Sequence, residues 1–149
     1  MSNVQPIYEN ASDCANEEAV AEVLRLRWKW DRLIKLPKMR KLDRAAVRSG
    51  DIVGYVEIKC RPGLTYGYGD GYYIAATKVI AAIDALAIFG IGTILAVRFL
   101  PNPTIWWTTL RGPYRAIWAG RKDRPSDPFA MEEHAVIPWR DFKQVIWKS

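Results

Sequence analysis

Two carboxylates and a lysine stand in an order that suits chemistry on a metal-activated water. Asp43 precedes a turn, and Glu57 and Lys59 follow that turn in a Glu-x-Lys triplet. Because side chains alternate along a strand, Glu57 and Lys59 fall on one face. Carboxylate oxygens are the ligands that Mg²⁺ prefers, and a lysine beside the ion can hold or activate a water. Asp43, Glu57 and Lys59 therefore predict an oxygen-ligand metal site.

A β-hairpin is the element that must position these side chains. Residues 45–47 and 52–56 are β-prone runs, and residues 48–51 between them, Arg-Ser-Gly-Asp, have the composition of a turn. Asp43 stands just before the first strand, and Glu57 lies at the far end of the second. We expect the two carboxylates to meet across the hairpin.

This arrangement resembles the PD-(D/E)xK nuclease superfamily, in which an Asp on one strand precedes Glu/Asp-x-Lys on the next. The residue before Asp43 is Leu42 instead of the proline that names the family, at a position that varies among members. The order of elements also agrees over most of the chain: an acidic helix, the hairpin, a helix carrying Lys78 and two further strands. The chain is similar to small phage-encoded members, including Holliday junction resolvase-like proteins that act on branched DNA.

The resemblance implies a fold and an activity. The fold would be α/β (α+β) and restriction-endonuclease-like, with a mixed central β-sheet flanked by helices. It would form one domain over residues 13–149, after a disordered segment at residues 1–12. The activity would be metal-dependent hydrolysis of phosphodiester bonds in DNA by an endonuclease, in phage recombination or genome processing. The alternative is an inactive nuclease-like fold that binds nucleic acid or protein, or that forms part of a virion.

The resemblance also implies a cofactor and roles for site residues. Mg²⁺, with Mn²⁺ as a substitute, would be held by Asp43, Glu57 and the carbonyl of Ile58. Lys59 would orient the attacking water or stabilise the charge that develops on the phosphate.

Two helices are expected to add side chains to this site. Superfamily members often supply a glutamate from the first helix, and Glu17 lies in phase with the apolar stripe of that helix. Glu18 and Glu22 are alternatives. Lys78 on the second helix is expected to face the site, because a lysine inside an apolar helix needs a partner or a route to solvent.

Structural explanations compete with these roles. Asp43 could accept a hydrogen bond from a neighbouring arginine, and Glu57 with Lys59 could form an exposed ion pair of little energetic value. A carboxylate at the start of an apolar strand costs free energy unless it is paired or bound to metal. We therefore favour metal ligation.

The charge of the chain favours a polyanionic partner. The net charge is +6, and residues 24–49 hold ten Lys or Arg against two Asp. A solvated helix face and a charged loop would also explain this run. Its position beside the carboxylates indicates contact with a DNA backbone. The candidate phosphate contacts are Arg40, Lys41, Arg44, Arg61, Arg121 and Arg124.

The long apolar segment over residues 72–100 raises the question of a membrane span. Lys78 and Asp84 interrupt it, and each charge near the centre of a bilayer would cost about 2.5 to 3.5 kcal/mol. A buried helix over 73–89, a glycine turn and a strand over 93–99 explain the segment better. We expect no membrane span and a cytoplasmic location, in the host if the chain is phage-encoded.

The remaining sequence gives seven further expectations. A homodimer would fit the cutting of two strands, and two cysteines with one histidine exclude a zinc site of the usual ligand number. The other predicted elements are a first helix capped by residues 13–16, a strand over 104–110, a loop over 112–131, a strand over 134–138 and a helix over 138–147.

Overall fold

The computed structural model describes residues 11–37, 41–120 and 131–145. Its elements in chain order are α1 (Ala11–Trp28), β1 (Arg32–Lys35), β2 (Arg44–Arg48), β3 (Asp51–Pro62), β4 (Tyr72–Ala75), α2 (Ala76–Phe89), β5 (Thr93–Leu100), β6 (Ile105–Leu110), β7 (Arg115–Gly120), β8 (Met131–Ile137), the 3₁₀ turn η2 (Trp139–Asp141) and β9 (Lys143–Gln144). Within these residues the strands form a six-stranded sheet, in the order β1-β2-β3-β5-β6-β9, and a three-stranded sheet, in the order β4-β8-β7.

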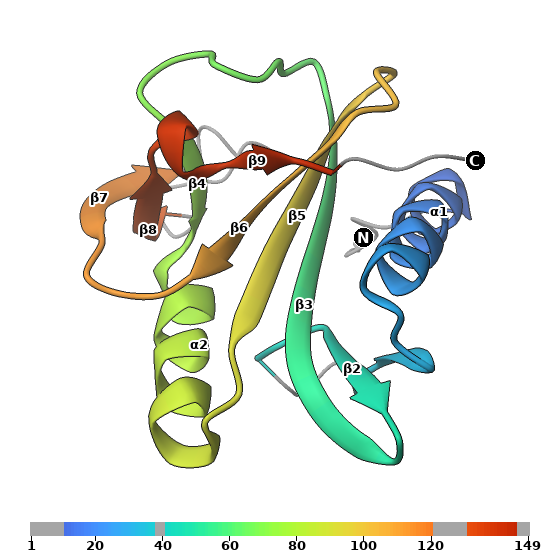
Figure 1. The fold of residues 1–149 in the computed structure, drawn as a ribbon. Helices are drawn as coiled ribbons and strands as arrows, with labels where there is room; N and C mark the ends of the chain where they lie inside the picture. The colour runs from blue at the N-terminus through green and yellow to red at the C-terminus, as the bar shows by residue number, and fades with distance from the viewer. Residues whose placement is uncertain (1–10, 38–40, 121–130, 146–149) are drawn as a thin grey trace, which may run out of the picture.

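The two helices lie on opposite sides of the larger sheet (Figure 1). Helix α1 buries Val20, Ala21 and Leu24 against one face. Helix α2 and the smaller sheet cover the other face. Strands β3 and β5 run parallel, so the chain must cross over between them, and it does so through β4 and α2. The prediction of a mixed central sheet flanked by helices is confirmed.

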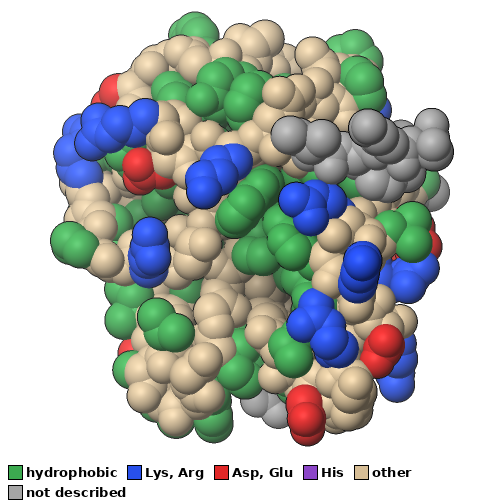
Figure 2. Space-filling model, in the orientation of Figure 1, with side chains coloured by type: hydrophobic (Ala, Val, Ile, Leu, Met, Phe, Trp, Pro, Cys, Tyr) green, Lys and Arg blue, Asp and Glu red, His purple; other side chains and the backbone are tan. Residues whose placement is uncertain are grey.

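The surface agrees with the positive net charge of the chain. Figure 2 shows one face on which Lys and Arg side chains surround a hollow, with hydrophobic side chains inside it. Acidic side chains are sparse on this face.

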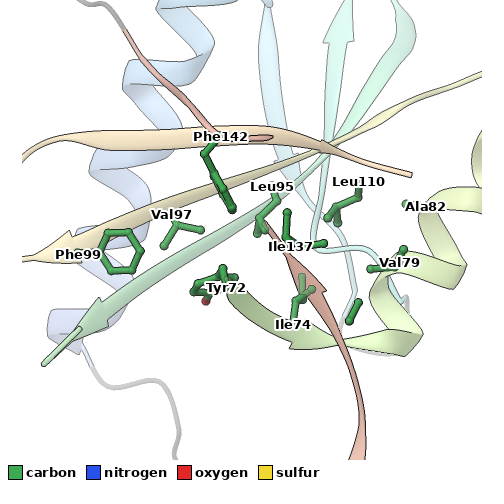
Figure 3. Packing of buried hydrophobic residues seen from close by; sticks show 11 residues of the cluster. Tyr72, Ile74, Val79, Ala82, Leu95, Val97, Phe99, Leu110, Ile137 and Phe142 are labelled. Carbon is green, nitrogen blue, oxygen red and sulfur yellow. The ribbon is translucent and has the colours of Figure 1, made fainter. Parts of the chain in front are cut away.

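The larger hydrophobic core fills the space between the six-stranded sheet, α2 and the smaller sheet (Figure 3). Leu95 and Val97 from β5 meet Val79 from α2 and Ile137 from β8 in one cluster. Burial of apolar surface in this cluster is what holds α2 over the parallel strands.

The predicted hairpin is present as β2 and β3, which pair antiparallel from Arg48↔Asp51 to Arg44↔Val56. Ser49 and Gly50 make its turn with positive φ values of 53° and 83°. Beyond Val56, strand β3 continues without pairing to β2. The paired region of the hairpin therefore ends beside Asp43 and Glu57.

Several predicted boundaries were wrong. Helix α1 begins at Ala11, so residues 13–16 lie inside it and do not cap it, and the last two residues of the segment predicted as disordered are helical. Residues 1–10 lie outside the described residues. The helix expected over 73–89 begins at Ala76, because Tyr72–Ala75 pair with β8.

The C-terminal third also differs from the prediction. Strand β7 lies inside the segment predicted as loop, and it pairs with β8. Instead of a terminal helix over 138–147, the chain forms η2 and then β9, whose residues pair with Trp106 and Trp107. No helix of the described residues combines the length and hydropathy needed to cross a bilayer.

Candidate active site

Asp43 and Glu57 face each other across the hairpin. Arg44 pairs with Val56, so Asp43 and Glu57 are the next residues along the two strands. Opposite residues of an antiparallel pair point to the same face. The backbone N–H of Asp43 donates a hydrogen bond of 3.1 Å to Glu57 Oε1. The two carboxyl groups therefore meet, as the hairpin predicts.

This carboxylate pair lies on the face of the sheet that α2 covers. Glu57 is paired in register with Leu95, and Lys59 with Val97, and both of these β5 residues belong to the core beneath α2. Glu57 is fully buried, with 0% of its side chain exposed, while the Asp43 side chain is 35% exposed. The pair therefore has one carboxyl group inside the protein and one that reaches solvent.

Lys78 brings a positive charge to the pair from α2. Its Nζ lies 3.1 Å from Glu57 Oε1 and 3.3 Å from Asp43 Oδ1. It also donates a hydrogen bond of 2.6 Å to the backbone carbonyl of Lys41. These contacts explain why the apolar helix α2 carries a lysine, because the Lys78 ammonium is paired with the Asp43 and Glu57 carboxylates.

The two carboxylate oxygens of Glu57 differ in their hydrogen bonding. Glu57 Oε1 accepts a hydrogen bond from the Asp43 backbone N–H and lies beside Lys78. Glu57 Oε2 is buried and has no hydrogen-bond partner among the described residues. Lys59 Nζ lies 4.0 Å from this oxygen. A buried carboxylate oxygen without a partner costs free energy, so this atom is where a ligand would be stabilising.

The pKa values of the two carboxyl groups move in opposite directions, upward for Glu57 and downward for Asp43. Burial, with the charge of Asp43 added, raises the pKa of Glu57 from 4.5 to about 7. Burial would also raise the pKa of Asp43, but the hydrogen bond with Glu57 and the charges of Lys78 and Lys59 hold it below its usual value. Near neutral pH the pair therefore holds one negative charge firmly and titrates the second.

Lys78 stays protonated in this setting. Burial alone would lower its pKa, but the carboxylates of Glu57 and Asp43 outweigh burial and raise it. The site thus combines a carboxylate pair with a permanent positive charge.

The donor set fits Mg²⁺, which binds one or two carboxylates and completes its octahedron with carbonyls, waters and phosphate oxygens. Asp43 and Glu57 Oε2 supply such oxygens. Within the described residues no third Asp, Glu, His or Cys joins them in a cluster. Ligation by the Ile58 carbonyl stays a prediction.

Comparison with known families identifies the family of the chain. Residues 3–145 match a family described as "Phage putative PDDEXK endonuclease". The chain belongs to this family. The resemblance to PD-(D/E)xK nucleases is thereby confirmed. No curated protein and no solved structure matches the chain.

In this member of the family, Glu17 does not join the carboxylate pair. Arg44 NH2 lies 2.9 Å from Glu18 Oε1 and 3.8 Å from Glu17 Oε1, and Glu22 pairs with Arg25 at 2.7 Å. The expected third carboxylate from the first helix is therefore not assembled with Asp43. The in-phase position of Glu17 on α1 brings it to Arg44 instead.

Arg44 was expected to contact phosphate, and its burial contradicts that role. The residue is 2% exposed, and it shares a sheet face with its partner Val56, which packs under α1. The side chain ties α1 to the strand that follows Asp43. Arg44 is thus a positioning residue of the PDDEXK site.

The other cationic candidates lie in different settings. Lys41 is exposed beside the site and gives its carbonyl to Lys78. Arg61 follows Lys59 on the same face of β3, and its Nε donates a hydrogen bond of 3.2 Å to Tyr72 Oη. This anchor for Arg61 was missed, because Tyr72 reads as part of an apolar run. Arg40, Arg121 and Arg124 lie outside the described residues.

Proposed function

We propose that the chain is a divalent-metal-dependent DNA endonuclease that uses Mg²⁺, or Mn²⁺ in its place. The observation that carries the proposal is the convergence of Asp43, Glu57, Lys59 and Lys78, with Glu57 Oε2 buried and lacking a hydrogen-bond partner among the described residues. Membership of a PDDEXK endonuclease family supports nuclease chemistry and implies DNA as the substrate.

Asp43 and Glu57 would hold the ion, Glu57 through Oε2, with the Ile58 carbonyl as a further oxygen. When bound, Mg²⁺ polarises the scissile phosphate and lowers the pKa of the attacking water. Lys78 holds the other carboxylate oxygens and reduces the repulsion between the two acids. The carboxylates are thereby fixed before substrate arrives, so little reorganisation remains for the reaction.

Lys59 is the residue placed to act on the reacting groups. Its side chain is 26% exposed, so its ammonium can reach a phosphate or a water at the surface of the site. It orients the water or stabilises the charge of the transition state. The attacking water releases one proton to solvent as its oxygen bonds to phosphorus, the bond from phosphorus to the 3′ oxygen breaks, and that oxygen takes up a proton from solvent.

The test is cleavage of labelled single strand, duplex, flap and four-way junction in Mg²⁺, Mn²⁺ or EDTA. We expect cutting by the wild type with either metal and none in EDTA. Lys59→Ala should abolish it while retaining the fold and DNA binding. Arg98→Ala is the matched control and should cut normally, because Arg98 lies outside residues 24–49 and donates its hydrogen bond to the Asn102 carbonyl. Cutting in EDTA, or full activity of Lys59→Ala, would overturn the proposal.

The finer part of the proposal is a preference for branched DNA, in phage recombination or genome processing in the host cytoplasm. Its support is the resemblance of the Asp43 and Glu57–Lys59 motif to small phage nucleases. Symmetric cutting of a junction needs two sites, so we also propose a homodimer. The substrate panel tests the preference, and light scattering of the protein alone tests the dimer.

A further inference from the structure

A second feature of the molecule has the chemistry of a nucleic-acid contact. A cleft of about 810 Å³ lies between β6, the loop that leads to β7, and the segment that runs from the end of β8 to β9. This basic cleft is defined by the lining residues Arg111, Arg115, Arg140 and Lys143.

The basic cleft is separate from the carboxylate pair. Thr108 lines the cleft, and both Thr108 and Glu57 pair with Leu95 of the intervening strand. Two strand spacings, about 10 Å, therefore separate their backbones. A ligand in the basic cleft would lie beyond the candidate active site and not inside it.

The charges of the basic cleft favour an anion. Four basic residues face two acidic ones, Asp70 and Asp141, so the lining carries a net charge of +2. Arg115 is already engaged in an ion pair with Asp70. Arg111, Arg140 and Lys143 remain as the groups that can meet a ligand, against Asp141.

Aromatic packing holds one wall of the basic cleft in place. Trp139 Nε1 donates a hydrogen bond of 3.0 Å to the Tyr68 carbonyl, and Tyr66 Oη donates one of 2.9 Å to the Trp139 carbonyl. Tyr66 stacks on Trp106 with ring centroids 3.7 Å apart. The backbone that presents Arg140 is therefore fixed, which reduces the entropy lost when its side chain binds a ligand.

The other wall of the basic cleft is also closely packed. A Cβ added at Gly112 would come within 3.0 Å of Ile83 Cδ1, so the loop after Arg111 is seated closely on α2. Guanidinium groups held along such a cleft suit the phosphates of a sugar-phosphate chain.

We propose that the basic cleft binds the phosphodiester backbone of a DNA segment outside the scissile phosphate. This inference rests on the proposed function for the identity of the ligand. Arginines at positions 111 and 140 give planar forks that match phosphate oxygens. The cleft then fixes how the substrate lies on the enzyme, while the carboxylate pair selects the bond that is cut.

The experiment is fluorescence anisotropy with labelled single-stranded and duplex oligonucleotides in EDTA, over a series of salt concentrations. The test variant is Arg111→Gln with Arg140→Gln, which removes two positive charges from the lining. The control is Ile52→Glu with Val53→Glu, which makes the same change of net charge at exposed positions of β3 outside the cleft lining. Thermal unfolding checks that both variants fold.

We expect the dissociation constant of the cleft variant to rise at least about tenfold, and the slope of log K against log salt to fall by about 2. The control should lose much less affinity. The oligonucleotide whose binding is lost tells whether the cleft takes a single strand or a duplex. Equal losses in both variants, or none in the cleft variant, would overturn the proposal.

The outcome separates the basic cleft from the nuclease assignment. If the wild type cuts with metal, Lys59→Ala does not, and the cleft variant binds DNA normally, the cleft proposal fails alone. If the cleft variant loses DNA binding and the wild type cuts no substrate, the cleft stands and the nuclease proposal fails.

Discussion

The Lys78 ammonium lies 3.1 Å from Glu57 Oε1 and joins helix α2 to a carboxylate that is completely buried in β3. An unpaired charge at that depth would be strongly destabilising. The contact therefore has two effects: it stabilises the metal-free protein, and it places a fixed positive charge beside the carboxylates that would hold a divalent ion.

Replacing Lys78 with methionine should strengthen metal binding. The change removes a positive charge beside Asp43 and Glu57 but keeps an unbranched side chain, so the repulsion of an incoming ion falls. We expect the affinity for Mn²⁺ at pH 8.5, measured by calorimetry, to rise about tenfold, or about 1.4 kcal/mol. Thr77→Met, at the exposed neighbouring position, should bind like the wild type. Unchanged or weaker binding by Lys78→Met contradicts this account of the site.

Glu57 should make the stability of the metal-free protein depend on pH. Its pKa is raised from 4.5 to about 7 in the fold, so the folded state keeps a proton that the unfolded chain releases. The free energy of unfolding should therefore fall between about pH 4.5 and 7 and then level off. The lowered pKa of Asp43 contributes fully above pH 4.5 and adds no slope there.

The measurement for Glu57 is urea unfolding in EDTA from pH 5 to 8, with Glu57→Gln beside the wild type. The neutral amide removes the titration, so the difference in unfolding free energy between the two proteins should shift in favour of the variant as pH rises. Parallel pH profiles would rule out the raised pKa.

Arg44 should be important for stability although it lies next to the site. Its buried guanidinium pairs with Glu17 and Glu18. Arg44→Met would leave the partly buried Glu17 without this cation. Because Glu18 is largely exposed, we expect a loss of about 2 kcal/mol in the free energy of unfolding, below the range for a fully buried pair. Chemical denaturation measures it, and Arg32→Met, at an exposed strand position, should change stability little.

Gly71 should tolerate no side chain. A Cβ there would lie 2.5 Å from the Ile137 carbonyl oxygen and 2.8 Å from Val136 Cγ1, so β4 would have to move away from β8. We expect Gly71→Ala to cost about 2 kcal/mol and to lower the melting temperature in calorimetry. Gly92→Ala meets nothing within 4 Å and is the matched control. Equal melting temperatures for the two variants would show that the strands can shift.

The hairpin and its charged residues could be predicted because their signals are local. Alternation sets the face of Glu57 and Lys59, and the turn composition sets the register that brings Asp43 opposite Glu57. Lys78 could be placed because a lone charge in an apolar helix must end at a partner.

The missed elements depend on contacts that are remote in sequence. Strand β4 continues into α2 without a break in composition, and only pairing with β8 distinguishes it as a strand. Strand β9 has two residues and exists because Trp106 and Trp107 offer an edge. The position of Glu17 along α1 predicts an inward side chain, but this position alone could not reveal that the side chain would lie beside Arg44.

The crossover between the parallel strands β3 and β5 sets when the site can form during synthesis. Asp43, Glu57 and Lys59 leave the ribosome before Lys78, which arrives only with α2. A nascent chain that ends before residue 76 therefore carries the acids without the ammonium that balances them. Docking of α2 neutralises the acids and assembles the site in one event, so no shorter nascent chain contains the complete centre.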